Sequence, residues 1–488
     1  MSRGFIFLYN ERMLKKNTPD IIQGYLEDSS NLSGGYAQGL YIPENEKDIV
    51  EILQECHAKN TPLTVSAGQT GTTGGCIPFG GWLLSTQKLN KIITVNPAGK
   101  YAVVQPGVTL EEIDAAVKKE GLLYPPDPTE KKAMLGGNVS TNASGGRGYR
   151  FGSTRDWIRR LKVILPSGEM LDLKRGGVKP SFPIPNYKMP ATKNSAGYFS
   201  KTGMDLIDLF IGAEGTLGIV NEIEIALAPV MDNTVDLVAF FPDENRAVDF
   251  VIKNNKGNDS NRRLYQSTIN FFEFFDDNTL QMLKKSYPHI PSNAKAAIYI
   301  EQETDRIEDW VPRLEEFGAS IDTCWVGMDD AQKEELAKFR HAVPEHINEI
   351  FKQHHSIKLA TDIAVPADKF KEMFHYYNNE LSTFGGNDEI MFIKFGHIGE
   401  NHLHVNLVPK TEKDIPLAKE LILRFVKKAV SLGGTVSAEH GIGKIKHAYL
   451  KEMYGQDGIN EMERVKRIFD PHWILGKGNI FPLPPHQK

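Results

Sequence analysis

Cysteine is scarce in this sequence, which has only Cys56, Cys76 and Cys324 among 488 residues. The three lie far apart, are odd in number and show no Cys-x-x-Cys spacing, so neither a disulfide framework nor a thiolate zinc site is predicted. The N-terminal apolar run, residues 5–9, is too short for a signal peptide core or a membrane span, and no other stretch is long enough to cross a bilayer. These absences favour a reducing, cytoplasmic compartment and no transmembrane segment.

An excess of charge of one sign is also missing. The 57 Lys and Arg residues and 62 Asp and Glu residues give a formal net charge of −5, so the protein has no overall positive field that would attract nucleic acid. Hydrophobic residues make up 40% and charged residues 24%, a balance typical of globular proteins. The length allows two or three domains with sizeable cores.

The chain shows no internal repeat, and the pattern of predicted strands and helices changes near residue 232. Before that point, the spacing of Ile49, Ile52, Leu53 and Cys56 predicts a helix, followed by a strand at 63–68 that enters a Gly-rich loop. A second helix is predicted from about Leu110, and a hairpin with its turn at 166–168. After 232, strands and helices alternate, which predicts a second sheet with helices packed on it. We therefore expect an arm (1–35), two domains (36–229 and 230–448) and a C-terminal segment (449–488).

Two Gly-rich stretches stand out in the first domain. They read "SAGQTGTTGG" at 66–75 and "LGGNVSTNASGGRGYRFGSTRD" at 135–156. Glycine lets backbone N–H groups point into one concavity and lets a phosphate approach closely, although the first stretch is neither a P-loop nor a dinucleotide-binding GxGxxG. A surface turn explains the first stretch equally well. Because two such loops are costly to order, we expect a large phosphate-bearing cofactor to lie across both.

Histidines gather in "FGHIGENHLHVN", residues 395–406. The pattern predicts a strand, a tight turn and a returning strand on which His402, His404 and Asn406 share one face, with His397 across the turn. Imidazoles gathered in this way suit a divalent metal of the zinc or manganese type. A cluster of hydrogen-bonded surface histidines is the structural alternative.

A carboxylate and an imidazole are adjacent in "SAEHGIGK", residues 437–444. Neighbouring side chains of an extended segment point in opposite directions, so we expect different tasks for the two. Glu439 would complete a His/His/carboxylate metal site. His440 would face the substrate and take a proton from its hydroxyl group.

Four motifs, in order, resemble the FAD-binding (PCMH-type) domain of the vanillyl-alcohol oxidase type. They are the first Gly-rich loop, the stretch from "PPDP" to "LGGNVSTNASG", "KNSAGY" (193–198) and "GAEGTLGIV" (212–220). The resemblance covers about 41–229 and implies an α+β fold that binds FAD. The contacts it implies are Ser66, Ala67, Gly68, Gln69, Thr70, Asp127, Gly136, Gly137, Ser140, Thr141, Asn142 and Ile219. Gln69 and Thr70 stand in the loop where some relatives carry a flavin-linking His, so non-covalent FAD is expected.

The second half resembles the C-terminal domain of the FAD-linked D-2-hydroxy-acid dehydrogenases, which include D-lactate dehydrogenase, the glycolate oxidase flavin subunit and D-2-hydroxyglutarate dehydrogenase. "GH" at 396–397, "LHVN" at 403–406 and "AEHGIG" at 438–443 carry the likeness. It implies an α+β substrate (cap) domain with an antiparallel sheet. The roles it implies are zinc or manganese ligation by His397, His404 and Glu439, proton removal by His440, and substrate binding by Arg340 and Asn406. His402, where relatives usually carry Asn, is an outer-shell candidate.

The implied reaction is oxidation of a D-2-hydroxy acid, of the D-lactate, glycolate or D-2-hydroxyglutarate class, to the 2-oxo acid. The electrons would pass to a quinone, an electron-transfer flavoprotein, a cytochrome or oxygen, and a homodimer is the expected assembly. Two alternatives remain: a non-redox transferase of the alkyl-dihydroxyacetone-phosphate synthase type, and a metal-dependent hydrolase whose Gly-rich loops bind no cofactor. A phosphate-bearing substrate without flavin turnover would favour the first, and a colourless protein the second.

Three departures from the family pattern bear on these expectations. Pro344 replaces a hydrogen-bonding Thr of the hydroxyglutarate enzymes, and Lys358 is shifted by two positions from the Lys that binds their distal carboxylate. Both argue against assuming a dicarboxylic substrate. In "FDPHWILGKGNIFP", Gly476 and Asn479 replace the usual Asn and Lys, which puts one flavin contact in doubt.

Overall fold

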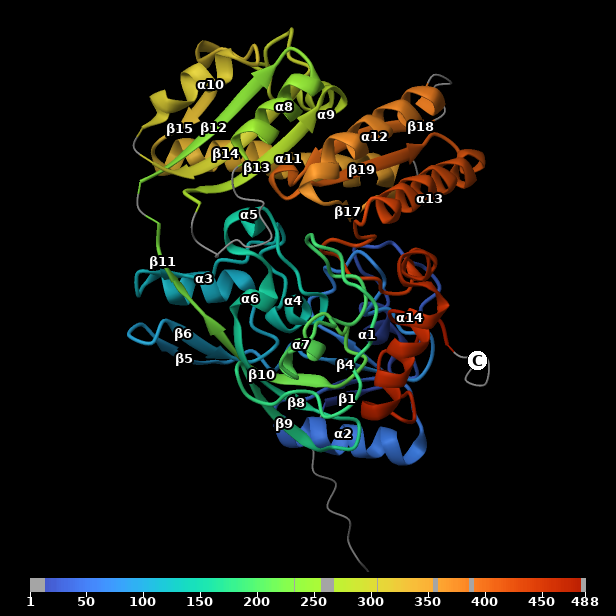
Figure 1. Ribbon diagram of the computed structural model, residues 1–488. Helices are drawn as coiled ribbons and strands as arrows, with labels where there is room; N and C mark the ends of the chain where they lie inside the picture. The colour runs from blue at the N-terminus through green and yellow to red at the C-terminus, as the bar shows by residue number, and fades with distance from the viewer. Residues whose placement is uncertain are drawn as a thin grey trace, which may run out of the picture.

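The computed structural model describes residues 14–231, 233–255, 267–304, 306–353, 359–385 and 390–483. Figure 1 shows two halves: residues up to about 230 lie below, and the sheet that begins at residue 234 lies above. The last helix, α14 (His447–Phe469), returns to pack beside the lower half. The predicted α+β architecture is confirmed. Within the described ranges, no helix combines the length and apolarity needed to cross a bilayer.

A small sheet positions the first Gly-rich loop. Its order is β1–β2–β4–β3, with β2, β4 and β3 parallel and β1 antiparallel to β2. The strands are Leu14–Lys16 (β1), Gly39–Ile42 (β2), Leu63–Ser66 (β3) and Trp82–Ser85 (β4). Helix α2 (Glu46–Lys59), capped by the Asn45 side chain, packs its predicted apolar face on this sheet. The short helix α1 (Pro19–Gln23) precedes β2.

The second sheet of the lower half is antiparallel, in the order β5–β6–β10–β8–β9. Its strands are Ile92–Asn96 (β5), Tyr101–Val104 (β6), Ile158–Ile164 (β8), Met170–Lys174 (β9) and Ile219–Ala226 (β10). The β8–β9 hairpin has the predicted turn. Leu122–Leu123 (β7) pairs with Ala228–Pro229 (β11).

The helices of the lower half are short, and three of them, α4, α5 and α6, contain residues of the second Gly-rich stretch. Helix α3 (Leu110–Lys118) begins where predicted, because Thr109 and Glu112 form a capping box. The others are Leu135–Thr141 (α4), Gly148–Phe151 (α5), Thr154–Trp157 (α6) and Ile207–Phe210 (α7). Helix α5 lies at the top of this half, next to the upper sheet (Figure 1).

The upper half is built on an antiparallel sheet, as the resemblance implied, and eight strands form it among the described residues. Its order is β15–β12–β14–β13–β18–β19–β16, and β17 also pairs with β19. The strands are Thr234–Phe241 (β12), Ile269–Asp276 (β13), Ala296–Glu303 (β14), Trp325–Gly327 (β15), Leu359–Ala360 (β16), Ile363–Ala364 (β17), Ile390–Gly396 (β18) and His402–Pro409 (β19).

Helices pack on this sheet. They are Glu244–Asn254 (α8), Asp277–Leu283 (α9), Val311–Glu315 (α10), Asp330–Gln353 (α11), Phe370–Gly385 (α12) and Ile415–Ser431 (α13). Short 3-10 turns occupy Ile307–Trp310, Ile321–Thr323, Ala367–Lys369, Ile398–Glu400 and Glu412–Asp414.

Two central strands of the upper sheet carry buried polar side chains. β13 and β19 are buried along their whole length, yet they contain Glu273, His402, His404 and Asn406. Burying such groups costs free energy unless they find partners. Helix α5 of the lower half contacts β13, so the buried polar groups of this strand lie close to the lower half (Figure 1).

Candidate active site

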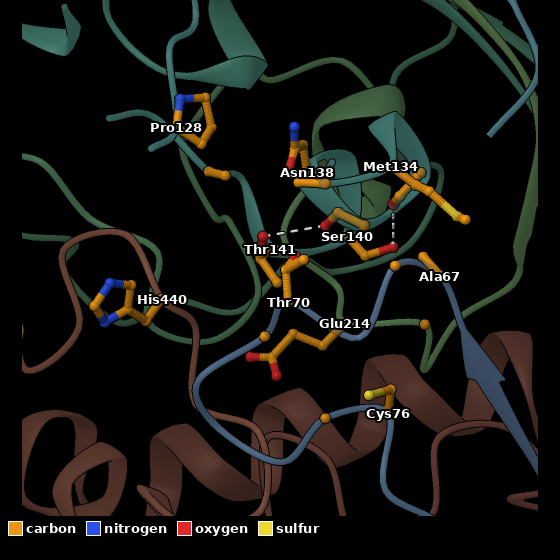
Figure 2. A pocket seen from close by; sticks show the side chains of 18 of the residues that line it. Ala67, Thr70, Cys76, Pro128, Met134, Asn138, Ser140, Thr141, Glu214 and His440 are labelled. Carbon is orange, nitrogen blue, oxygen red and sulfur yellow. Dashed lines mark hydrogen bonds between the residues drawn. The ribbon is translucent and has the colours of Figure 1, made fainter. Parts of the chain in front are cut away.

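A cavity of about 320 Å³ joins the two Gly-rich stretches to the upper half. Its lining includes nine of the twelve predicted flavin contacts, namely Ala67, Gly68, Gln69, Thr70, Gly136, Gly137, Ser140, Thr141 and Ile219. The same lining includes His397, Glu439 and His440. Figure 2 shows Ala67, Thr70, Ser140 and Thr141 around one hollow, with His440 reaching it from the C-terminal part of the chain.

The other three predicted contacts support the loops without lining the cavity. Ser66 ends β3 and is fully buried. Asp127 bridges to Gly145 and pairs with Lys131, Nζ to Oδ1 2.5 Å. Asn142 caps α4 in a left-handed conformation, and its Oδ1 accepts a hydrogen bond from the Arg155 N–H.

The cavity suits a polar cofactor. Within the described part of the chain, the Ser66 Oγ and the Asn138 Nδ2 are buried without a hydrogen-bond partner, and Asn138 lines the cavity. Buried polar groups are normally satisfied, so the Asn138 Nδ2, which lies at the cavity, favours a bound polar molecule. The Gln69 side chain donates to the Gly24 and Glu27 carbonyls, which fixes the first loop in place.

Four candidate ligands converge at the upper end of the cavity. The ligand atoms of His397, His402, His404 and Glu439 all lie within 4.8 Å of one another. The His397 Nε2 is 3.2 Å and the His404 Nε2 is 3.5 Å from the Glu439 Oε1. His397 directly follows β18, His404 lies on β19 and Glu439 lies on the loop after α13. The predicted set of His397, His404 and Glu439 is therefore brought together.

Outer contacts orient the two predicted imidazole ligands. The His397 Nδ1 is 2.7 Å from the Glu273 Oε1, and the His404 Nδ1 is 3.2 Å from the Thr361 carbonyl oxygen. Both contacts turn the Nε2 atoms towards Glu439, as outer-shell partners of metal ligands do. Burial would lower the pKa of His397, but Glu273 and Glu439 raise it to about 9. The carboxylates beside His397 therefore favour a cation at this position, and the set of imidazole and carboxylate donors fits zinc or manganese.

The expectation that Glu439 and His440 point in opposite directions is wrong. Residues 437–443 do not form an extended strand. The Asp362 carboxylate accepts hydrogen bonds from the backbone N–H groups of both Glu439 (3.2 Å) and His440 (2.9 Å), which curls the segment. The His440 Nε2 consequently lies 3.8 Å from the Glu439 Oε1, and its ring stacks on His404 with centroids 5.3 Å apart.

Asp362 is a site residue that was not predicted from the sequence. Its Oδ2 is 3.5 Å from the His440 Nδ1 and 2.9 Å from the Lys446 Nζ. Burial would raise the pKa of Asp362, but His440 and Lys446 outweigh it and hold the pKa well below its usual range. Burial lowers the pKa of His440 to about 4, so its ring is neutral at pH 7. The sequence signal that could have indicated Asp362 is a lone acidic residue in the mostly apolar stretch "KLATDIAVP".

Arg340 and Asn406 lie on elements that border the cluster. Arg340 is on α11, and its Nη2 is 2.9 Å from the same Glu273 Oε1 that contacts His397. Asn406, on β19, is 2% exposed, and its Nδ2 lacks a hydrogen-bond partner among the described residues. The Asn406 Nδ2 is therefore available to a ligand, whereas the Arg340 Nη2 is already engaged with Glu273.

The structure describes two of the three places at which the sequence departs from the family pattern. Pro344 lies inside α11 one turn after Arg340, so it supplies no N–H to the Arg340 carbonyl. Lys358 lies outside the described residues. Asn479 lines the cavity and donates to the Gly75 and Glu214 carbonyls, while the Lys444 Nζ is 2.5 Å from the Asn479 Oδ1. Lys444 thus adds a half-buried cation beside the substituted position.

Comparison with known proteins gives the lower and upper halves separate family matches. The model described as "FAD binding domain" matches residues 37–174, and the one described as "FAD linked oxidases, C-terminal domain" matches residues 237–480. Solved structures agree at the level of the fold. A 4-ethylphenol oxidase from Gulosibacter chungangensis has a TM-score of 0.70 at 15% identity, covering 97% of this chain and 95% of that one. An alkyldihydroxyacetonephosphate synthase has a TM-score of 0.67 at 16% identity, covering 96% and 82%.

Curated relatives extend over nearly the whole chain. The glycolate oxidase subunit GlcD of Bacillus subtilis is 30% identical over 450 residues, 90% of this chain and 88% of that protein. A D-lactate dehydrogenase of Anaerostipes hadrus is also 30% identical, covering 89% and 87%. A D-2-hydroxyglutarate dehydrogenase of Xanthomonas citri pv. viticola is 28% identical, covering 96% and 94%. With its two-domain fold and these matches, the chain belongs to the FAD-linked oxidase family, whose members are FAD-dependent dehydrogenases and oxidases.

Proposed function

We propose that this enzyme oxidises a D-2-hydroxy acid to the corresponding 2-oxo acid. One observation carries the proposal: a single cavity is lined both by the Gly-rich loops and by His397, Glu439 and His440. A cofactor on the loops would therefore adjoin a proton acceptor and a cation-attracting cluster. Relatives named for D-lactate, glycolate and D-2-hydroxyglutarate support this substrate class.

His440 is the proposed general base. Its ring is neutral at pH 7, and its Nδ1 faces the Asp362 carboxylate, so the Nε2 is left to accept the proton of the substrate hydroxyl. This division of the two ring nitrogens is the one in which a carboxylate orients a histidine base. FAD, when bound, supplies the acceptor for the hydride that leaves the hydroxyl-bearing carbon.

Arg340 and Asn406 are the proposed substrate-binding residues. The Arg340 fork suits a carboxylate, and the Asn406 Nδ2 is a buried donor whose partner the substrate would provide. His397, His404 and Glu439 would hold a divalent zinc or manganese ion, with His402 behind them. When bound, the ion supplies a Lewis acid that lowers the pKa of the substrate hydroxyl.

The transferase alternative is less well supported. The likeness of this chain to the alkyldihydroxyacetonephosphate synthase structure, at 16% identity, concerns the fold alone. The relatives at 28–30% identity carry dehydrogenase and oxidase names.

The three free cysteines also accord with the cytoplasm as the proposed compartment.

The flavin is expected to be bound non-covalently. The Gln69 side chain is held by the Gly24 and Glu27 carbonyls, and Thr70 is not a residue that commonly forms a flavin link. Acid precipitation of the purified protein should release all of the flavin into the supernatant. Yellow colour that stays with the pellet would contradict this prediction.

Turnover of a panel of acids tests the proposed function. D-lactate, glycolate and D-2-hydroxyglutarate are offered with an artificial electron acceptor, beside L-lactate as the stereochemical control. At least one of the first three should be oxidised to its 2-oxo acid. Turnover of none of them, in protein that contains its FAD, would count against the proposal.

A further inference from the structure

The two oxygens of the Glu439 carboxylate have different surroundings. The Oε1 faces the three imidazoles of His397, His404 and His440. The Oε2 accepts from three donors of the lower half: the Lys193 Nζ at 3.0 Å, the Ser144 Oγ at 2.9 Å and the Gly145 N–H at 3.3 Å. A carboxylate offers about four lone-pair positions over its two oxygens, so the Oε2 is saturated. Only the Oε1 remains for a ligand.

Lys193 is the charged member of this donor set, and it is shared with a second acid. Its Nζ is also 2.8 Å from the Glu400 Oε2, and the two side chains are only 8% and 12% exposed. The Lys193 Nζ therefore lies between two carboxylates, those of Glu400 and Glu439. Lys193 and Glu400 also line a separate polar cavity of about 90 Å³, whose lining does not include Glu439.

The place of Lys193 differs from what its motif suggested. "KNSAGY" was one of the four marks of the flavin domain, yet Lys193 is absent from the lining of the flavin cavity within the described residues. It reaches instead from the lower half to the carboxylate in the upper-half cluster. The lower half therefore acts on the candidate metal site through this ammonium.

We propose that Lys193 is a positioning residue that restricts Glu439 to ligation through one oxygen and moderates its hold on a divalent cation. This inference rests on the proposed metal site. A charge-assisted hydrogen bond is about twice as strong as a neutral one, so the Oε2 cannot readily leave the ammonium for the cation. A second carboxylate oxygen on the cation would fill a position that a catalytic site keeps open for substrate.

The test removes both charges of the buried pair, so that neither is left alone. In Lys193→Met/Glu400→Gln, the Oε2 keeps only the neutral Ser144 and Gly145 donors. We expect Zn²⁺ to bind about 10-fold more tightly, and flavin reduction by D-lactate or the preferred acid to slow by about 10-fold, the scale at which outer-shell partners act. Affinity is measured in metal-free, FAD-containing protein by competition with a coloured chelator, which does not depend on activity.

Two companions control the experiment. Lys193→Arg keeps the charge and should stay near the affinity of the unaltered protein. Lys394→Met/Glu244→Gln removes a partly buried pair of the upper half, Nζ to Oε2 2.5 Å, and should leave Zn²⁺ affinity unchanged. Zn²⁺ binding to the Lys193/Glu400 variant that is unchanged or weaker would overturn the role of Lys193 alone. Failure of the unaltered protein to bind Zn²⁺ would overturn the metal proposal, and this inference with it.

Discussion

Replacing His440 with alanine should slow reduction of the flavin by substrate by about 10²–10⁴-fold, the usual contribution of a general base. Metal content should stay near that of the unaltered protein, because His397, His404 and Glu439 keep their contacts with one another. Anaerobic stopped-flow absorbance measures the reduction, and metal analysis of the same sample measures the ion. Asp362→Asn should also slow reduction, by less, since it weakens the partner of the His440 Nδ1 but leaves the base in place.

Two rival roles for His440 give different results. A second compact group of potential ligands consists of Asp362, His404 and His440. The Lys446 Nζ, however, already contacts the Asp362 Oδ2 at 2.9 Å. If His440 were a metal ligand, its replacement would lose the metal together with activity, and added metal would partly restore turnover. If it were only structural, the folded fraction would reduce its flavin at the normal rate. Either result would remove His440 from its proposed role.

Replacing His404 with alanine should abolish metal binding and lower turnover by roughly 10³-fold or more, because a Lewis-acid metal supplies several kcal/mol. The flavin spectrum should survive, since His404 lies on β19 and the Gly-rich loops belong to the lower half. His289→Ala, at an exposed position, is the matched control and should change neither quantity. A His404→Ala protein that keeps its metal and its activity would contradict the ligand assignment.

Chelation provides an independent form of the same prediction. A strong chelator should remove the ion from the unaltered protein and stop turnover while FAD stays bound. Zinc or manganese added back should restore activity. Full turnover in a chelated, metal-free preparation would show that the cluster of His397, His404 and Glu439 serves some other purpose.

The local elements were largely predictable from the sequence, because local signals specify them. The helix at α2 follows from its apolar spacing and the Asn45 cap, and α3 begins at its capping box. The hairpin of β8 and β9 follows from its turn residues. By contrast, the order of the upper sheet depends on pairings such as β13 with β18, which join segments more than a hundred residues apart.

The site was predictable as a set of residues, but its internal geometry was not. Motifs named His397, His404, Glu439 and His440, and the structure brings all four together. Their relative directions depend on Asp362, 77 residues before Glu439 in the chain, which bends the backbone between them. The contact of Lys193 with Glu439 likewise joins the two halves, and no local pattern indicates it.

We propose that one cavity holds a flavin beside a base that deprotonates a D-2-hydroxy acid. The most direct test is anaerobic mixing of the FAD-containing protein with D-lactate, glycolate or D-2-hydroxyglutarate, and separately with L-lactate, while the flavin absorbance is followed. We expect at least one of the first three acids to bleach the flavin in a single turnover and L-lactate to leave it oxidised. An oxidised flavin that persists with every acid, in protein that holds both FAD and metal, would contradict it.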